Sequence, residues 1–274
     1  MKSIFYTIYK NIFFLLLSIL LLLNCKKDIT GDIIVFDINE IFPVKTLDIE
    51  DVAEIEYLIL DISDDEYLFR FFYTMTDSFI ICEAKNNFLF FSRETGKPVS
   101  KVDRHGNGPG EYGTISRLPV YSELQNELFF CSSFHIFVYG RDGTFKRKFP
   151  IFKPTFFTSA LYDFDDEHLL MNGFPLGKIE MPDTSFLLIS KKDGLAEVIK
   201  IPFEKRINFV FMQGIAGTVA DTYFAVRNEK DYLLTDYSSD TVYRFTPERQ
   251  LTPILVRRPP IQEMETKIFL HSWL

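Results

Sequence analysis

The chain has 274 residues, of which 47 % are hydrophobic and 16 % aromatic, and its formal net charge is −8. This apolar content is too high for a disordered tether and is sufficient for a large core. The acidic balance argues against a nucleic-acid partner, because phosphate binding requires a basic surface.

Residues 1–24 have the pattern of an export signal. Lys2 and Lys10 precede the run Ile12–Leu23, which is apolar apart from Ser18. A run of this length is typical of the apolar region of a signal peptide, whereas a membrane span needs about 20 residues. We therefore predict a signal peptide over residues 1–24 rather than a spanning helix.

The apolar run ends at Leu22-Leu23-Asn24-Cys25, which resembles the lipobox of bacterial lipoproteins. The resemblance implies cleavage before Cys25 and acylation of its sulfur and new amine, so we expect a palmitate-bearing anchor. Asn24 departs from the usual Gly, Ala or Ser, and the alternative is a signal peptide cut elsewhere with Cys25 incidental. Lys26, rather than Asp, fits sorting to the outer membrane, on its periplasmic or cell-surface face.

Cleavage leaves residues 25–274 and removes two lysines and no acidic residue, so the net charge becomes −10. An acidic body gains nothing from anionic headgroups, so the predicted contact with the membrane is the lipid alone. We expect residues 25–32 to form a short polar tether.

From residue 33 onward, short apolar or alternating runs are separated by turn residues, which predicts strands and no long helix. In residues 134–139 both sets of alternate residues are apolar or aromatic apart from one histidine, as expected where sheets stack face to face. The predicted strands include Ile55–Leu60, Phe79–Cys82, Phe88–Phe91, Leu128–Cys131, Phe134–Tyr139, Phe186–Ile189, Tyr223–Val226, Tyr232–Leu234 and Thr241–Phe245.

A longer repeat appears when the turns are aligned. FSRETG, VYGRDG and ISKKDG end at Gly96, Gly143 and Gly194, which are 47 and 51 residues apart. Asp-Gly between apolar runs is a strong hairpin signal, because glycine accepts positive φ. In a fourth, degenerate copy, YRFTPER, we expect Pro247 to stand in for the glycine.

A period near 50 residues predicts an all-β fold, a β-propeller with one four-stranded blade per repeat. A β-sandwich would instead show turns every 8–12 residues without this longer register. At about 50 residues per blade, the mature chain supplies about five blades. Propellers normally close by pairing strands from both termini, whereas this sequence ends on the apolar run KIFLHSWL. We therefore expect a propeller domain over residues 33–274 that is incomplete at its C-terminus.

Residues 104–113, RHGNGPGEYG, carry a family resemblance together with the preceding FLFFSRETGKPVSKVD. They resemble the six-bladed β-propeller lipoproteins of Bacteroidetes-type bacteria, and residues 44–68 are similar to that family's N-terminal segment. The resemblance implies six blades, of which about five are present here, but no particular ligand. It also marks a loop that contacts a ligand or holds the blades: Arg104, His105, Gly106, Gly108, Pro109, Gly110, Glu111 and Tyr112.

Gly108, Gly110 and Gly113 also satisfy the spacing G-x-G-x-x-G. Dinucleotide binding at that motif needs a helix N-terminus after the glycines, and the residues that follow include Pro119 and several β-branched side chains. We predict a tight inter-blade loop in which glycines adopt positive φ, with a ligand-contacting loop as the alternative.

We predict no catalytic residue, metal or cofactor. His105 lies near Asp103 and Glu111, but this spacing suits a solvated turn equally well, and the histidines lack metal-binding spacing. The acidic clusters at residues 61–66 and 163–167 lack the EF-hand pattern for calcium and are interpreted as charged hairpin tips.

Cys82 and Cys131 lie inside apolar strands of different repeats. A disulfide between two different repeats would be unusual. We therefore expect both to be buried core thiols rather than a disulfide.

The sequence favours a non-enzymatic, lipid-anchored outer-membrane propeller that binds a ligand or protein partner with its loops. One alternative is a hydrolase or lyase acting on a glycan or peptide, which requires His or Asp/Glu from three or more blades at the channel mouth. Another is a structural subunit of a membrane complex, which predicts a large exposed aromatic patch.

Overall fold

The computed structural model describes residues 33–51, 53–115, 119–132, 135–151, 156–175, 186–205, 225–236 and 238–264. The predicted signal peptide, Cys25, the tether and the terminal run KIFLHSWL lie outside these residues. In the described part of the chain, no helix is long and apolar enough to cross a membrane.

The described residues form four β-sheets that follow one another in the sequence, here called blades 1 to 4. Blade 1 contains β2 (Phe71–Met75), β3 (Phe79–Ala84), β4 (Asn87–Ser92) and β5 (Pro98–Val102). Blade 2 contains β6 (Val120–Ser122), β7 (Glu127–Ser132), β8 (His135–Gly140) and β9 (Phe145–Pro150). Blade 3 contains β10 (Phe156–Asp163), β11 (His168–Pro175), β12 (Phe186–Ser190) and β13 (Ala196–Ile199).

Blade 4 contains β14 (Ala225–Asn228), β15 (Asp231–Leu234), β16 (Thr241–Phe245) and β17 (Leu251–Arg258), and β1 (Ile34–Asp37) joins it as a fifth strand. Within every blade, consecutive strands pair antiparallel. β1 instead pairs parallel to β17, with Ile34 opposite Leu255 and Asp37 opposite Arg258. The N-terminal part of the described chain thus extends the last blade.

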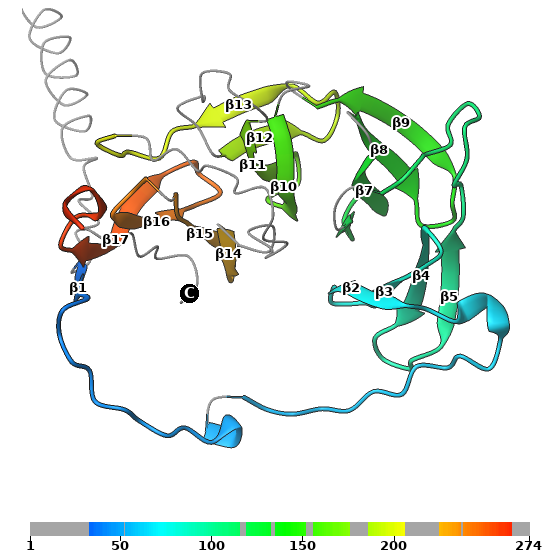
Figure 1. Ribbon diagram of the computed structural model, residues 1–274. Coiled ribbons are helices and arrows are strands. Elements are labelled where there is room, and N and C mark those ends of the chain that lie inside the picture. Colours follow the sequence, from blue (N-terminus) through cyan, green and yellow to red (C-terminus); the bar gives the residue numbers. More distant parts are fainter. Residues whose placement is uncertain are drawn as a thin grey trace, which may run out of the picture.

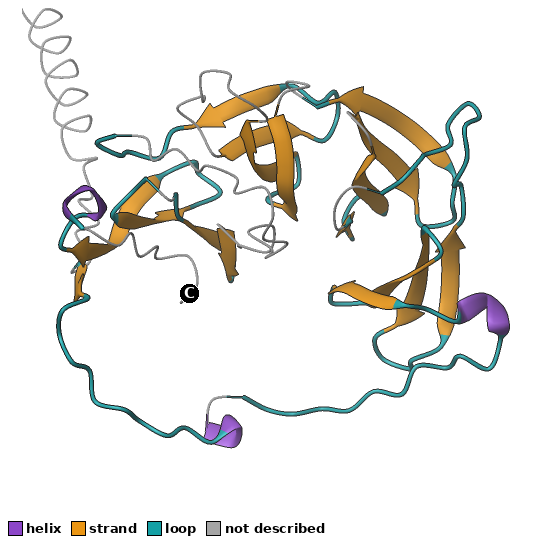
Figure 2. Ribbon diagram, in the orientation of Figure 1, coloured by secondary structure: helices purple, strands orange, loops and turns teal. Residues whose placement is uncertain are grey.

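The four blades stand side by side in an arc, with β2, β10 and β14 towards its inside and β5, β9 and β13 towards its outside (Figure 1). The segment between β1 and β2 crosses the open side of the arc and contains the short 3₁₀ helices η1 (Ile49–Asp51) and η2 (Asp65–Tyr67) (Figure 2). A further 3₁₀ helix, η4 (Ile261–Glu263), follows β17.

The repeated turns occupy one equivalent position, between the third and fourth strands of each blade. Gly96, Gly143 and Gly194 have φ of 69°, 81° and 77°, as predicted for glycine hairpin turns. In blade 4 the prediction that Pro247 replaces the glycine is wrong. Arg249 takes the left-handed place, with φ of 62°, and its N–H donates to Thr246 O.

Both faces of the middle strands are buried, as the alternation in residues 134–139 predicted. Ile136 and Val138 of β8 pack into the core between blades 2 and 3, and Phe137 and Tyr139 pack into the core between blades 1 and 2. The core between blades 3 and 4 is built in the same way, around Phe186 and Leu188 of β12 together with Tyr232 and Leu234 of β15.

Most of the predicted strands are confirmed, but Ile55–Leu60 is not a strand in the structure and pairs with no described strand. The strands that were not predicted are β1, β2, β5, β6, β9, β10, β11, β13 and β17. Among them, β5 and β9 are rich in polar residues, because an outermost strand leaves one side open to solvent.

Cys82 and Cys131 are buried thiols in β3 and β7, as predicted. Burial raises the pKa of the Cys82 thiol from 9.0 to about 11, which lowers its thiolate fraction at neutral pH roughly a hundredfold. We expect the folded chain lacking Cys25 to react with iodoacetamide far more slowly than the urea-unfolded chain. Mass spectrometry of the alkylated protein measures this, and rapid labelling of both thiols in the folded state would contradict their burial.

Candidate binding site

The loop at residues 104–112 joins β5, the outermost strand of blade 1, to β6, the first strand of blade 2. Two backbone hydrogen bonds join the ends of the loop: Gly106 N–H donates to Tyr112 O (2.9 Å), and Tyr112 N–H donates to Arg104 O (3.1 Å). His105 and Tyr112 form a β-bridge, and their rings meet edge to face. Among the described residues that follow, up to Ser122, there is the strand β6 and no helix, as predicted for an inter-blade loop.

The glycines of this loop leave room for the Glu111 carboxylate and for a neighbouring ring. Glu111 Oε2 accepts a hydrogen bond from Gly108 N–H (2.7 Å), and a Cβ on Gly106 would lie 2.0 Å from the same oxygen. Gly110 has φ of +72°, and a Cβ there would lie 3.0 Å from the Phe145 ring. Pro109 stands in the turn between Gly108 and Gly110. The prediction of positive φ therefore holds for Gly110 and is wrong for Gly106, Gly108 and Gly113. At Gly106 an added Cβ would displace the Glu111 carboxylate.

Tyr112 anchors the loop between blades 1 and 2. Its side chain is fully buried, and its single hydroxyl proton is shared between Asn86 O (2.8 Å) and Val102 O (3.2 Å). Burial raises the pKa of the Tyr112 phenol. The hydroxyl of Tyr139 donates to Gly110 O, and Arg104 Nε donates to Gly143 O in blade 2 (3.3 Å). These contacts assign a structural role to Arg104, Gly110 and Tyr112.

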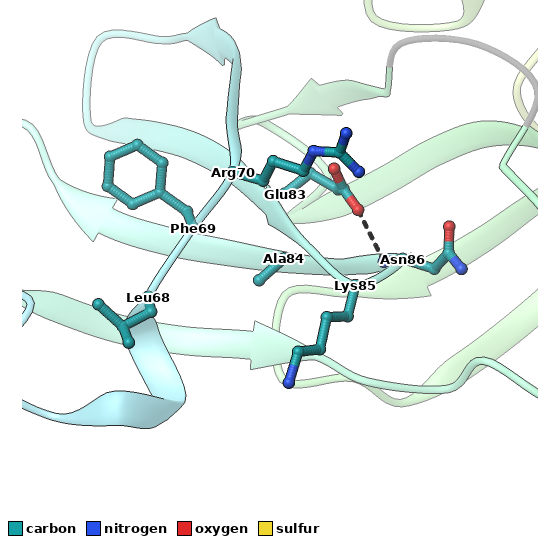
Figure 3. A pocket seen from close by; sticks show the side chains of 7 residues that line it. All are labelled: Leu68, Phe69, Arg70, Glu83, Ala84, Lys85 and Asn86. Carbon is teal, nitrogen blue, oxygen red and sulfur yellow. Dashed lines mark hydrogen bonds between the residues drawn. The ribbon is translucent and has the colours of Figure 1, made fainter.

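A pocket of about 370 Å³ opens beside the same end of blade 1. Leu68, Phe69 and Arg70 precede β2, and Glu83–Asn86 form the end of β3 and its turn into β4 (Figure 3). The turn is fixed by positive φ at Lys85 (50°) and Asn86 (69°), the geometry of a tight two-residue hairpin.

The Glu83 carboxylate of the pocket is held in place by the backbone. Glu83 Oε1 accepts a hydrogen bond from Asn86 N–H (2.7 Å), and Arg70 N–H donates to Glu83 O (2.8 Å) (Figure 3). The Arg70 guanidinium lies 4.8 Å from the centre of the Phe71 ring. Lys85 adds a second cation to the rim.

The pocket adjoins the 104–112 loop, because Asn86 lines the pocket and its carbonyl accepts the hydrogen bond from Tyr112. The pocket itself offers two cations, one carboxylate and the apolar Leu68 and Phe69, a set that suits a ligand with both an anionic and an apolar part. The sequence analysis missed this pocket, although Lys85-Asn86 between two apolar runs is itself a turn signal.

A second group of charged residues joins blades 2 and 3. Lys191 is 2 % exposed, and its Nζ donates to Asp165 O (2.6 Å) and Ser122 Oγ (3.2 Å) and forms an ion pair with Asp163 (2.5 Å). Arg147 donates to Lys191 O and makes a bidentate pair with Glu127, at 2.8 and 2.6 Å. Each ion pair lies within one blade, and the bonds from Arg147 to Lys191 O and from Lys191 to Ser122 Oγ join blades 2 and 3, so the group is structural.

Glu127 makes this group sensitive to acid. Burial by itself would raise the pKa of Glu127, but hydrogen bonds and charge from Arg147 and Lys146 outweigh it and hold the pKa below the ordinary 4.5. A carboxylate with a lowered pKa stabilises the fold above its unfolded pKa, and that contribution is lost as pH falls through the folded pKa.

We therefore expect the free energy of unfolding to decrease as the pH falls below about 4.5. Glu127→Gln is expected to lower that free energy by about 1.5–3 kcal/mol at pH 7 and to flatten its decrease in acid. Urea unfolding followed across this pH range measures both effects. If the free energy of unfolding fell equally steeply with pH in wild type and variant, carboxylates other than Glu127 would be the cause of the acid sensitivity.

In the acidic clusters considered for calcium, several carboxylates already interact with neighbouring residues of the chain. Asp61 accepts bonds from the Ser63 N–H and hydroxyl, which lower the pKa of Asp61, and Asp64 caps η2. In the second cluster, Asp165 pairs with His168 Nδ1 (2.9 Å). Among the described residues, no group of three or more His, Cys, Asp or Glu could hold a metal ion.

The family model of 6-bladed beta-propellers matches residues 24–272, and the chain belongs to this family. The predicted all-β propeller fold is thus confirmed, with four blades formed by the described residues. No protein of curated function matches the sequence.

One solved structure supports this fold with a TM-score above 0.5, and two others are similar over part of the chain. A Bacteroides fragilis protein, described as a candidate exported protein, is 18 % identical with a TM-score of 0.55, over 82 % of this chain and 60 % of its own. Virginiamycin B lyase from Staphylococcus aureus is 12 % identical with a TM-score of 0.40, over 72 % of this chain and 58 % of its own. A Bacteroides vulgatus protein is 12 % identical with a TM-score of 0.44, over 67 % and 56 %. The chain thus spans less than two thirds of each of these structures.

Proposed function

We propose that this protein is a lipid-anchored propeller of the outer membrane that binds a ligand or protein partner without catalysis. The pocket beside the 104–112 loop carries the binding part of the proposal, because its cations and carboxylate lie at a blade end beside an apolar wall. The apolar run that ends at Cys25 supports the anchor.

The alternative, a hydrolase or lyase acting on a glycan or peptide, requires acidic or imidazole groups from several blades around the channel. In the described residues of the innermost strands β2, β6, β10 and β14, the one acidic residue is Asp163, which is paired with Lys191. The remaining residues are mainly apolar or aromatic, which suits a binding surface more closely than a catalytic one.

The binding proposal is tested by probing the mature chain, without its lipid, on arrays of glycans and of peptides. Any compound retained is then titrated by calorimetry against wild type, Arg70→Ala and a matched control, Arg93→Ala, whose arginine lies in the β4–β5 turn. We expect Arg70→Ala to weaken binding about tenfold or more and Arg93→Ala to leave it unchanged. Equal affinity of wild type, Arg70→Ala and Arg93→Ala would exclude the pocket as the binding site.

The same titration distinguishes binding from catalysis. Mass spectrometry of the compound after prolonged incubation is expected to return it unchanged. A shortened or eliminated product would contradict the proposal and support the hydrolase or lyase.

A further inference from the structure

Arg249 occupies the place in blade 4 that a glycine occupies in each of the other three blades. Its φ of 62° costs energy in a residue other than glycine. In blade 2 the glycine turn lies against the outermost strand of the preceding blade, since a Cβ on Gly143 would lie 3.4 Å from Lys101 O of β5. In blade 3 a Cβ on Gly194 would lie 2.4 Å from the Phe149 ring of β9. In blade 4 the Arg249 side chain makes the contact with the preceding blade.

The Arg249 guanidinium reaches two groups of blade 3. Its Nη1 donates to Glu197 Oε2 of β13 (2.6 Å), and its Nη2 lies 3.1 Å from Nε2 of His168, the first residue of β11. The side chains of Arg249 and Glu197 are 44 % and 62 % exposed, so solvent screens this ion pair and its contribution to stability is small. The His168 side chain is only 17 % exposed. The contact with His168 is therefore the better shielded link between the two blades.

The other side of the imidazole shows where its proton lies. His168 Nδ1 lies 2.9 and 3.2 Å from the two carboxylate oxygens of Asp165. The backbone N–H groups of Glu167 and His168 hold this carboxylate in place, at 2.8 and 2.6 Å from Oδ1. An ionised carboxylate only accepts hydrogen bonds, so Nδ1 carries a proton and donates it. Arginine has no acceptor, so its contact with Nε2 is a hydrogen bond only while Nε2 has no proton.

A second proton on His168 would reverse the contact with Arg249. Both nitrogens of an imidazolium are donors, so two donors on two cations would then face each other across 3.1 Å. The hydrogen bond would be lost, and the like charges would repel each other. The bond from Nδ1 to Asp165 exists in both protonation states, so the change falls on the side of Arg249.

The other charged groups around His168 keep their charge where histidine titrates. Histidine is the side chain that ordinarily changes its charge between pH 5 and 8. Hydrogen bonds with Thr246 and within its own backbone lower the pKa of Glu248, which keeps this carboxylate ionised over that range. The charged residues of the elements packed around His168 are Asp163, Asp165, Asp166, Glu167, Lys191, Glu197, Glu248 and Arg249.

We propose that the contact between His168 and Arg249 is a pH-sensitive link between blades 3 and 4. While Nε2 has no proton, it accepts the bond from Arg249 and holds the β16–β17 turn against blade 3. When His168 binds its second proton, this bond is lost, the exposed Glu197 remains as the partner of Arg249, and the turn loosens from blade 3. The link lies between blades 3 and 4, whereas the pocket of the proposed function lies on blade 1.

The test is a double-mutant cycle of His168→Phe and Arg249→Met in the mature chain without its lipid. Urea unfolding is measured at pH 8 and pH 5, both above the acid range in which Glu127 loses its charge. The cycle isolates the contact between the two side chains from their contacts with Asp165 and Glu197. We expect a coupling of about threefold or more in the unfolding equilibrium constant at pH 8, and none or a repulsive one at pH 5. Equal coupling at both pH values, or none at pH 8, would overturn the proposal.

Arg244 supplies the matched control. Its side chain in β16 is 45 % exposed, close to the 44 % of Arg249, and it pairs with Asp231 of its own blade. A cycle of His168→Phe and Arg244→Met is expected to show no coupling at either pH. If Arg244 showed the same pH-dependent coupling as Arg249, overall charge would be the cause and the proposal would be overturned.

A second measurement does not depend on the stability of the variants. The ¹⁵N NMR spectrum of histidine-labelled wild type at pH 8 reports which ring nitrogen of His168 carries the proton, and the spectrum of His168→Phe assigns the signal. We expect a proton on Nδ1 and none on Nε2. A proton on Nε2 at this pH would overturn the proposal, because Nε2 could then not accept a bond from Arg249.

Discussion

Replacing Lys191 with Met is expected to lower the free energy of unfolding by about 2–4 kcal/mol, because a buried cation is removed from a partly exposed carboxylate. The change leaves the Asp163 carboxylate without its cation and deprives Asp165 O and Ser122 Oγ of a donor. Methionine keeps the length of the side chain, so lost volume is a minor cause. Urea unfolding at pH 7 measures the difference.

Lys192 supplies a matched control, since it follows Lys191 in the same turn and is exposed. Lys192→Met is expected to change stability by less than about 0.5 kcal/mol. In the double variant Lys191→Met/Asp163→Asn, part of the loss should be recovered, because no charge is then left uncompensated. Equal stability of Lys191→Met and Lys192→Met would show that the buried network is not formed.

Replacing Tyr112 with Ala is expected to cost about 3–5 kcal/mol, the range for removing a buried aromatic side chain. The ring contacts Phe88, Phe130 and Tyr139, which come from blades 1 and 2, so the cavity would open between blades. Tyr112→Phe keeps the ring and loses the bonds to Asn86 O and Val102 O, at about 1–3 kcal/mol.

Tyr57→Ala is the control for this pair, because Tyr57 is exposed and should change stability by less than about 0.5 kcal/mol. Thermal and urea unfolding of wild type, Tyr112→Ala, Tyr112→Phe and Tyr57→Ala measure their order of stability. If Tyr112→Phe were as stable as wild type, Tyr112 would be free to serve a ligand, and the structural interpretation of the loop would be wrong.

The local parts of the fold could be predicted from the sequence. A glycine turn between apolar runs depends on residues that are adjacent in the chain, so Gly96, Gly143 and Gly194 were located with their correct role. Arg249 was missed, because a non-glycine residue at positive φ costs energy and leaves no compositional signal. Pro247 was chosen instead because proline is a common turn residue.

Properties set by distant residues could not be predicted. Lys191 and Lys192 are the same residue type in one turn, yet one is buried against blade 2 and the other is exposed. The run Ile55–Leu60 has strand composition, but pairing requires a neighbour, and the described residues supply none. The pocket likewise joins residues before β2 to the end of β3, a contact that only the antiparallel register creates.

We propose that the mature protein is held at a membrane by a lipid on Cys25. The most direct test of this claim is labelled-palmitate incorporation in bacteria that express the full chain, compared with Cys25→Ala and with Cys82→Ala as a control for a buried thiol. We expect label in wild type and Cys82→Ala and none in Cys25→Ala. Equal label in Cys25→Ala, or none in wild type, would contradict the claim.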